Sequence, residues 1–186
     1  MASNGTDSAS CGSVSNPCKT IQWAVDIATS GQIVCVWSGD PYHSCSTLGT
    51  QVNKSLTLQS IGAGNAIIDC RGNGRAFDFF NLTATVVLRG FYITGGHGVG
   101  GGALASVLFR LDIQDCVFVN NSCPNGPNNG GAIFTEGEIV NINNCTFLDN
   151  GGTNYSVATA YVNYGGAISV SNVVMAITNS VFINNR

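Results

Sequence analysis

The sequence predicts an all-β fold, a right-handed single-stranded parallel β-helix with an N-terminal capping α-helix. First, a unit of 21 residues recurs without a gap at 101–121, 130–150 and 165–185. Second, apolar and polar residues alternate within each unit, which is the period of a strand and not of a helix. Third, such a unit is too small to bury its own apolar face, so like units must stack on one another, with right-handed crossovers as the default.

A weaker copy of the unit, at 74–94, extends the stack toward the N-terminus. Aligned without a gap, it places Phe91 in the column of the later phenylalanines and Ala84 and Val86 on the inward face of a strand. We therefore divide the chain into an irregular segment (1–18), a cap helix with the first coils (19–73) and the regular coils (74–186).

Stacking in register predicts two ladders of identical side chains and a pair of backbone constraints. Asparagine ladders are favourable because each amide bonds its copy in the next coil. Polar pairs such as Asn143-Asn144 predict corners, since Asn tolerates the left-handed conformation. The Gly-Gly-Ala start predicts either close backbone approach or a positive φ. The ladders comprise Phe91, Phe118, Phe147 and Phe182, and Asn121, Asn150 and Asn185.

The segment before the regular units predicts one helix and several short strands. Asn16 is a suitable helix cap and Pro17 a suitable first helical residue. Ile21, Ala24, Val25 and Ala28 then recur at the spacing of one helical face, and Gly31 ends the helix. Strands follow at 33–37, 55–59 and 66–70.

Composition excludes several classes of protein. The 186 residues suffice for one domain or part of one, and 44% of them are hydrophobic. Only 9% are charged and the formal net charge is −3, so there is no basic patch and we expect no nucleic-acid partner. The apolar runs are too short for a membrane span. No apolar signal-peptide core follows Met1, so we expect the natural start to lie upstream or to have been removed.

Cysteines and glycosylation sequons indicate an oxidising, extracellular setting and a secreted eukaryotic glycoprotein. The eight cysteines are Cys11, Cys18, Cys35, Cys45, Cys70, Cys116, Cys123 and Cys145. A Cys11–Cys18 bridge is expected, Cys35, Cys45 and Cys70 pair among the first coils, and Cys116 pairs with either Cys145 or Cys123. The six sequons start at Asn4, Asn53, Asn81, Asn120, Asn144 and Asn154.

The motifs GGAI or GGAL, followed by F-x-x-N at 118–121, 147–150 and 182–185, resemble the polymorphic outer-membrane protein repeat. Proteins that carry it resemble the pectin-lyase-like superfamily of right-handed β-helices. The segment CKTIQWAVDIATSGQIVCVWSGDPY also resembles the helix and strand that open such folds. The resemblance implies a β-helix but leaves function open, because the superfamily includes lyases, hydrolases, esterases, adhesins and fibres. The sequons and cysteines indicate a eukaryotic extracellular member.

The charged residues do not form a recognisable catalytic set. The acids of the units fall at different places of the repeat, and only Glu136 and Glu138 share a strand face, where we interpret them as solubilising an exposed edge. We interpret His97 as an exposed loop residue. Asp69, Arg71, Arg75 and Arg89 form the richest charged cluster, a site for an acidic sugar or an ordinary surface ion pair. No C-x-x-C pair exists, so we expect no metal, and we expect no cofactor.

These observations favour a non-catalytic extracellular structural or adhesive glycoprotein. The chain stops just after a complete F-x-x-N, so we expect an uncapped end that self-associates or binds other extracellular proteins, with end-to-end stacking into a fibre. The first alternative is a carbohydrate-active enzyme of the lyase or hydrolase kind. The second is a carbohydrate-binding module that uses Trp23 and Trp37, or Tyr155, Tyr161 and Tyr164.

Overall fold

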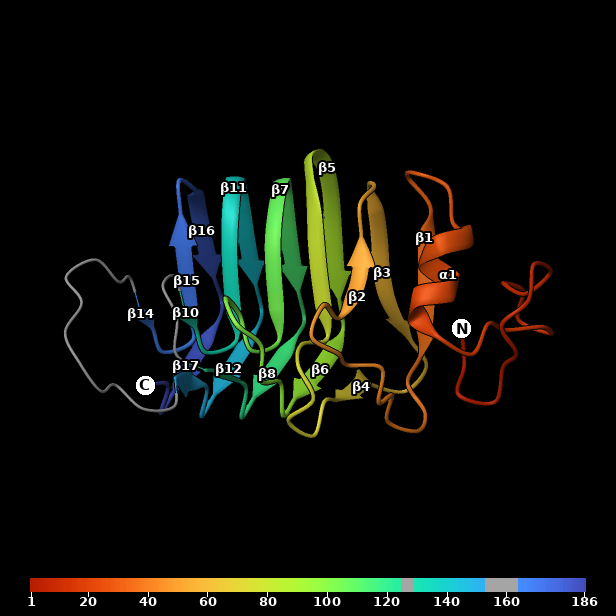
Figure 1. Ribbon diagram of the computed structural model, residues 1–186, viewed down its shortest axis with the longest axis horizontal. Coiled ribbons are helices and arrows are strands. Elements are labelled where there is room, and N and C mark those ends of the chain that lie inside the picture. Colours follow the sequence, from red (N-terminus) through yellow and green to blue (C-terminus); the bar gives the residue numbers. More distant parts are fainter. Residues whose placement is uncertain (125–128, 153–163) are drawn as a thin grey trace.

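The computed structural model describes residues 1–124, 129–152 and 164–186 of the chain. Within these residues the chain coils into a parallel β-helix whose strands stand side by side along the long axis, with one short helix near the N-terminal end (Figure 1). The N-terminal elements are α1 (Ile21–Ile27), β1 (Ile33–Trp37), β2 (Thr50–Val52), β3 (Leu56–Ile61) and β4 (Ala66–Asp69). The middle elements are β5 (Phe77–Arg89), β6 (Phe91–Thr94), β7 (Leu104–Gln114), β8 (Val117–Val119), β9 (Ser122–Cys123) and β10 (Asn129–Gly130). The last elements are β11 (Ile133–Asn143), β12 (Thr146–Leu148), β13 (Gly151–Gly152), β14 (Tyr164–Gly165), β15 (Ile168–Ser171), β16 (Val174–Thr178) and β17 (Val181–Ile183).

Two main sheets run the length of the molecule, and every strand pair in them is parallel. The larger sheet has the order β1-β3-β5-β7-β11-β15, with β2 beside β5 and β16 beside β11. The smaller has the order β17-β12-β8-β6-β4. Successive coils thus contribute one strand or strand pair to each sheet, as a β-helix requires. β5, β7 and β11 are long because they bend over one edge of the coil, at the top of Figure 1.

Helix α1 covers the first coil but begins later than the sequence predicts. Its N-cap is Thr20, whose side chain accepts a hydrogen bond from the Trp23 amide at 3.2 Å. The expected Asn16–Pro17 start is wrong, because the carboxylate of Asp7 accepts from the Lys19 and Thr20 amides and holds this stretch as a loop. The helix also ends at Ile27, before the expected stop at Gly31.

The weaker unit is aligned differently from the gapless prediction. β5 pairs with β7 at an offset of 27 residues up to Asn81, and at an offset of 25 from Thr85 onward. Two residues are therefore inserted between these points. Val86, not Ala84, lies opposite Leu111 of the next coil. The alignment of Ala84 with Leu111 is wrong for this reason, but its predicted inward position is confirmed, because Ala84 is buried.

The same insertion removes Phe91 from the aromatic ladder. Ile93 lies in the column of Phe118, whereas Phe91 packs edge-on against Phe77 with ring centroids 5.7 Å apart. The rest of the ladder is confirmed. Phe147 stacks on Phe118 at 4.9 Å and on Phe182 at 4.7 Å, with nearly parallel rings.

The asparagine ladder is also confirmed, and its hydrogen bonds are more extensive than amide-to-amide pairing. The backbone N–H and Nδ2 of Asn121 both donate to Oδ1 of Asn150, each at 3.0 Å. Asn150 donates in the same way to Asn185, at 3.0 and 2.9 Å. Each asparagine also donates from Nδ2 to a carbonyl of the preceding coil, such as that of Phe118. Buried asparagines thus fasten one coil to the next.

The structure shows two backbone features of the repeated unit, left-handed corners and close backbone approach at the Gly-Gly pairs. The predicted corner is present, because Asp115, Asn144 and Asn179 adopt positive φ angles of 51–55°. A second left-handed corner, which the sequence analysis missed, lies at Asn120, Asp149 and Asn184. The Gly-Gly pairs serve close approach. A Cβ atom at Gly131 would lie 2.0 Å from the carbonyl oxygen of Gly166.

Two of the expected disulfides are present. Cys11 is bonded to Cys18 and Cys45 to Cys70, both near the N-terminal end. Cys35 is a free thiol, so its expected pairing among the first coils is wrong.

The pairings predicted for Cys116 are also wrong, because Cys116 and Cys145 are buried free thiols. Their column instead accepts hydrogen bonds from the preceding coil. The Phe91 amide donates to Cys116 Sγ at 3.5 Å, and the Cys145 amide donates to Ser180 Oγ at 3.1 Å. In the last described coil, Ser180 Oγ therefore accepts a backbone hydrogen bond, as Cys116 Sγ does in an earlier coil.

Candidate functional site

The last described coil, made of β15, β16 and β17, exposes the side chains that earlier coils bury. Phe182 is 44% exposed, whereas Phe118 and Phe147, in the same column, are fully buried. Ile177, 42% exposed, lies opposite the buried Ile142, and Val170, 37% exposed, lies opposite the buried Thr135. A hollow of about 470 Å³ opens onto this face, and Ala167, Met175, Ile177 and Phe182 contribute to its lining. We call this surface the open coil face.

The hydrogen-bonding pattern of the open coil face matches that of the coils beneath it. Oδ1 of Asn185 accepts from the N–H and Nδ2 of Asn150, as Oδ1 of Asn150 does from Asn121. Each of the inner asparagines has its own donors bonded to the next coil. The face that Asn185 and Phe182 present is therefore the template on which a further coil of the same pattern would fit.

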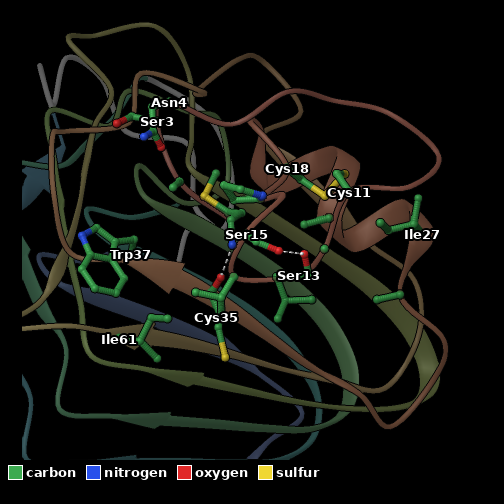
Figure 2. A pocket seen from close by; sticks show the side chains of 18 of the residues that line it. Ser3, Asn4, Cys11, Ser13, Ser15, Cys18, Ile27, Cys35, Trp37 and Ile61 are labelled. Atoms are coloured by element: carbon green, nitrogen blue, oxygen red, sulfur yellow. Dashed lines mark hydrogen bonds between the residues drawn. A yellow bond between two sulfur atoms is a disulfide. The ribbon is translucent and has the colours of Figure 1, made fainter.

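A second candidate is a groove of about 1150 Å³ at the N-terminal end (Figure 2). It lies between the segment 1–18, the end of α1 and the strand β1. Trp37, which is 52% exposed, and Ile61 line its apolar side. Ser3 and Asp40 line its polar side, and Ser3 Oγ donates to Asp40 Oδ2 at 3.4 Å. An aromatic platform beside polar groups is suited to a small polar ligand with an apolar face.

The other aromatic residues considered for recognition do not join this groove. The indole Nε1 of Trp23 donates to the carbonyl oxygen of Ser8 at 3.0 Å, so Trp23 fastens the N-terminal segment to α1. Tyr155 and Tyr161 lie outside the described residues, as does the side chain of Tyr164.

Glu136 and Glu138, the two acids that share a strand face, both lie on the exposed bend of β11. Gly137 between them has a φ of 155° and sits where a Cβ atom would lie 2.0 Å from the Leu108 carbonyl oxygen. Because this glycine lets β11 bend tightly over β7, the two glutamates project from an edge of the coil and not from a concave wall.

The predicted charged cluster does not assemble as one group. Arg71 Nε lies 3.3 Å from Asp69 Oδ2, which confirms an ion pair between these two residues. Arg75 instead donates to the carbonyl oxygen of Val99, and Arg89 to Oε1 of Gln114. The sequence analysis missed the partner that does reach Asp69. His43 Nδ1 lies 2.9 Å from the Asp69 carbonyl oxygen and 3.9 Å from its carboxylate.

His97 is partly buried, so the interpretation as an exposed loop residue is wrong. Its Nδ1 lies 2.8 Å from Ser122 Oγ, and its amide donates to the Gly74 carbonyl oxygen at 2.7 Å. These contacts bridge three coils, and His97 is a structural residue of the stack.

Two further carboxyls have environments that no repeat pattern signals. Asp112, 8% exposed, pairs with Arg110 at 2.9 Å and accepts from Asn141 Nδ2 at 2.7 Å. Burial raises the pKa of Asp78, and the charge of Arg75 opposes that rise. Arginine and amide partners satisfy the carboxylate of Asp112.

The sequons occupy different settings. Asn4, Asn53, Asn120 and Asn144 are exposed, and Asn81 is half-buried at the bend of β5. Asn154 lies outside the described residues. Among the described residues, no group of three or more His, Cys, Asp or Glu side chains is placed to hold a metal ion. In the same part of the chain, no helix has the length and hydropathy of a membrane span.

The fold and these surfaces define a parallel β-helix with a helix-capped N-terminal end and an exposed coil at the other end of the described stack. Comparison with protein-family models, curated protein sequences and solved structures returns no match to this chain.

Proposed function

We propose that this chain is a non-catalytic extracellular scaffold that associates with a second copy of itself through the open coil face. The observation that carries the proposal is that the phenylalanine and asparagine ladders reach the open coil face with Phe182 still 44% exposed. Burying exposed aromatic and aliphatic side chains drives association, and the unpaired edges of β15–β17 supply donors and acceptors for added strands.

The open coil face is chemically suited to a copy of itself. It carries exposed aliphatic side chains, such as Val170 and Ile177, and an aromatic ring, and the polar side chains that line its hollow are the amides of Asn184 and Asn185. Uncharged surfaces of this kind do not repel one another when they meet. A second copy therefore covers the apolar lining of this hollow.

Three further observations support the extracellular part of the proposal. The Cys11–Cys18 and Cys45–Cys70 disulfides require an oxidising compartment. The sequence carries six sequons. Its GGAI and F-x-x-N motifs resemble the polymorphic outer-membrane protein repeat, which belongs to a surface-exposed class of β-helix, and we propose that this chain is a eukaryotic relative.

The test is the molecular mass of the purified chain in solution, measured by light scattering over a range of concentrations. We expect the wild-type mass to rise with concentration and the Phe182→Asp variant to remain a monomer. Leu82→Asp is the matched control, because Leu82 is also an exposed aliphatic residue but lies on β5, away from the open coil face. A wild-type protein that stays monomeric throughout would refute the association.

A second candidate function is carbohydrate binding in the N-terminal groove, supported by the exposed indole of Trp37 beside Asp40 and Ser3. Sugar rings stack their apolar faces on such indoles while carboxylate and hydroxyl groups bind their hydroxyls. Tryptophan fluorescence would be titrated with soluble oligosaccharides, for the wild type and for Trp37→Ala. A shift in the wild type that Trp23→Phe retains and Trp37→Ala loses would support the groove, and no shift with any oligosaccharide would refute it.

A further inference from the structure

The bend of β5 protrudes beyond the bends of its neighbours. The pairings on either side of it place residues 80–85 opposite only 53–55 of the preceding coil and 107–110 of the next. The extra residues therefore project beyond the neighbouring bends, and β5 rises highest at the top of Figure 1. We call residues 80–85 the β5 crest.

The sequon Asn81-Leu82-Thr83 lies within the β5 crest and is held by its own hydrogen bonds. Oδ1 of Asn81 accepts from the Thr83 amide at 3.0 Å and from Thr83 Oγ1 at 2.9 Å. Nδ2 of Asn81 donates one hydrogen to the Asn53 carbonyl oxygen at 2.7 Å. A side-chain amide nitrogen carries two hydrogens, so a bond to a sugar replaces the second and leaves this contact in place.

Exposed apolar side chains flank Asn81 along the β5 crest, and another lies on the adjacent bend. Leu82 is 68% exposed and Phe80 is 41% exposed, both on the β5 crest. Phe109, on the bend of the adjacent strand β7, is 39% exposed. Grouped apolar side chains of this kind mark a surface that something covers. Aromatic rings pack well against the C–H faces of a pyranose, which are apolar although the edges of the sugar are polar.

Two of the other described sequons, those at Asn120 and Asn144, are explained by the fold itself. Asn120 and Asn144 adopt the left-handed corner conformation, which favours asparagine whether or not a sugar is attached. Nδ2 of Asn144 donates to Asp115 Oδ1 at 2.8 Å. The hydroxyl that completes the Asn120 sequon, Ser122 Oγ, is bonded to His97 in the partly buried interior. The corner accounts for these asparagines, whereas no repeat column accounts for Asn81.

We propose that Asn81 is an N-glycosylation site and that its glycan covers the apolar side chains of the β5 crest. In the reaction, Asn81 Nδ2 forms a bond to the anomeric carbon of a lipid-pyrophosphate-linked oligosaccharide. The bond from that carbon to the pyrophosphate oxygen breaks, the lipid pyrophosphate leaves with the electron pair, and the amide loses one proton. This inference rests on the extracellular part of the proposed function, because the donor belongs to the secretory pathway.

The test is glycopeptide mapping of the full chain secreted from eukaryotic cells behind a cleavable leader. We expect the peptide containing Asn81 to carry an oligosaccharide that Asn81→Gln and Thr83→Ala abolish and Thr83→Ser retains. Asn144→Gln is the matched control and is expected to leave that peptide glycosylated. Enzymatic removal of the glycan is expected to increase the binding of an apolar fluorescent dye, and Leu82→Ser to reduce that increase.

An unmodified Asn81 in secreted protein would overturn the inference, whether the remaining sequons are occupied or empty. A glycan at Asn81 whose removal leaves dye binding unchanged would refute its role as a cover. Neither result bears on the open coil face, because the association is measured on unglycosylated protein by its mass and by Phe182→Asp. The two proposals can therefore fail separately.

Discussion

Replacing Asn150 with alanine tests whether the buried asparagine ladder holds the coils together. Asn150 is 1% exposed, and its side chain makes four hydrogen bonds. Two are accepted from Asn121, one is donated to the carbonyl oxygen of Phe118, and one is donated to Asn185. Alanine removes all four and leaves the buried groups of the preceding coil without these partners.

The expected cost follows from the number of bonds and from their burial. A typical hydrogen bond contributes about 1 kcal/mol net, so four predict a loss of about 4 kcal/mol in the free energy of unfolding. Asn185→Ala is the matched control. It removes three bonds of the same kind, but Asn185 is only half-buried and water replaces them, so we expect a loss of about 1 kcal/mol.

The assay is equilibrium urea unfolding followed by far-ultraviolet circular dichroism. Tryptophan fluorescence is unsuitable, because Trp23 and Trp37 both lie in the N-terminal part of the stack and report on that end alone. Stacked coils unfold in segments when their interfaces weaken, so the slope of the transition is fitted together with its midpoint. If Asn150→Ala costs no more than Asn185→Ala, the reasoning that burial makes the ladder strong is refuted.

Three other predictions concern the glycines, the thiols and the N-terminal segment. Gly131→Ala is expected to lower the free energy of urea unfolding by more than about 3 kcal/mol, because its Cβ would lie 2.0 Å from a backbone oxygen. The control Gly39→Ala is expected to lower it by less than about 1 kcal/mol, because its Cβ would meet only a side chain, at 3.1 Å. Burial raises the pKa of the Cys116 thiol well above its ordinary value. Mass spectrometry after alkylation of the native protein at pH 8 should therefore find Cys116 unmodified and the half-exposed Cys35 labelled. Labelling of both cysteines would contradict the burial of Cys116. Burial opposes ionisation of Asp7, but hydrogen bonds from Thr20 and Lys19 outweigh the effect of burial and lower the pKa of the Asp7 carboxyl. The contribution of Asp7 to stability is therefore present above the unfolded-state pKa and is lost as the pH falls through the lower folded-state pKa. The protection of the amides of residues 16–20 against hydrogen exchange, relative to their intrinsic rates, should therefore fall in acid in the wild type, and a wild-type pH profile identical to that of Asp7→Asn would contradict this account.

The sequence alone predicted the features that repeat. Three copies of one unit define the columns of Phe118 and Asn121, so stacking, ladder members and the first corner followed from spacing. The alignment of the fourth copy was wrong because a two-residue insertion between Asn81 and Thr85 leaves the strand pattern intact on both sides. Alternation has a period of two, so inserting two residues keeps the inward face inward and leaves no trace in the pattern.

The features that do not repeat were harder to predict. Cys116 and Cys145 share a column, and that spacing fits a disulfide as well as a hydrogen-bonding column. Only Ser180, which occupies the same column in the next unit, hints that the position needs an acceptor for an amide. The contact between His43 and Asp69 joins a loop to a strand 26 residues away, and no sequence period relates them.

The two ends of the stack differ, and the difference bears on how copies would meet. At the N-terminal end α1 buries Ile21, Ala24 and Val25 against the first coil, and the segment tied by Cys11–Cys18 packs beside it. A fibre would need the open coil face of one copy to displace this cap from the next, at the cost of the apolar area that the cap buries. Two open coil faces would meet without displacing the cap, so we expect a closed pair. A mass that saturates at twice that of the chain would support the pair, and a mass that keeps rising would favour the fibre.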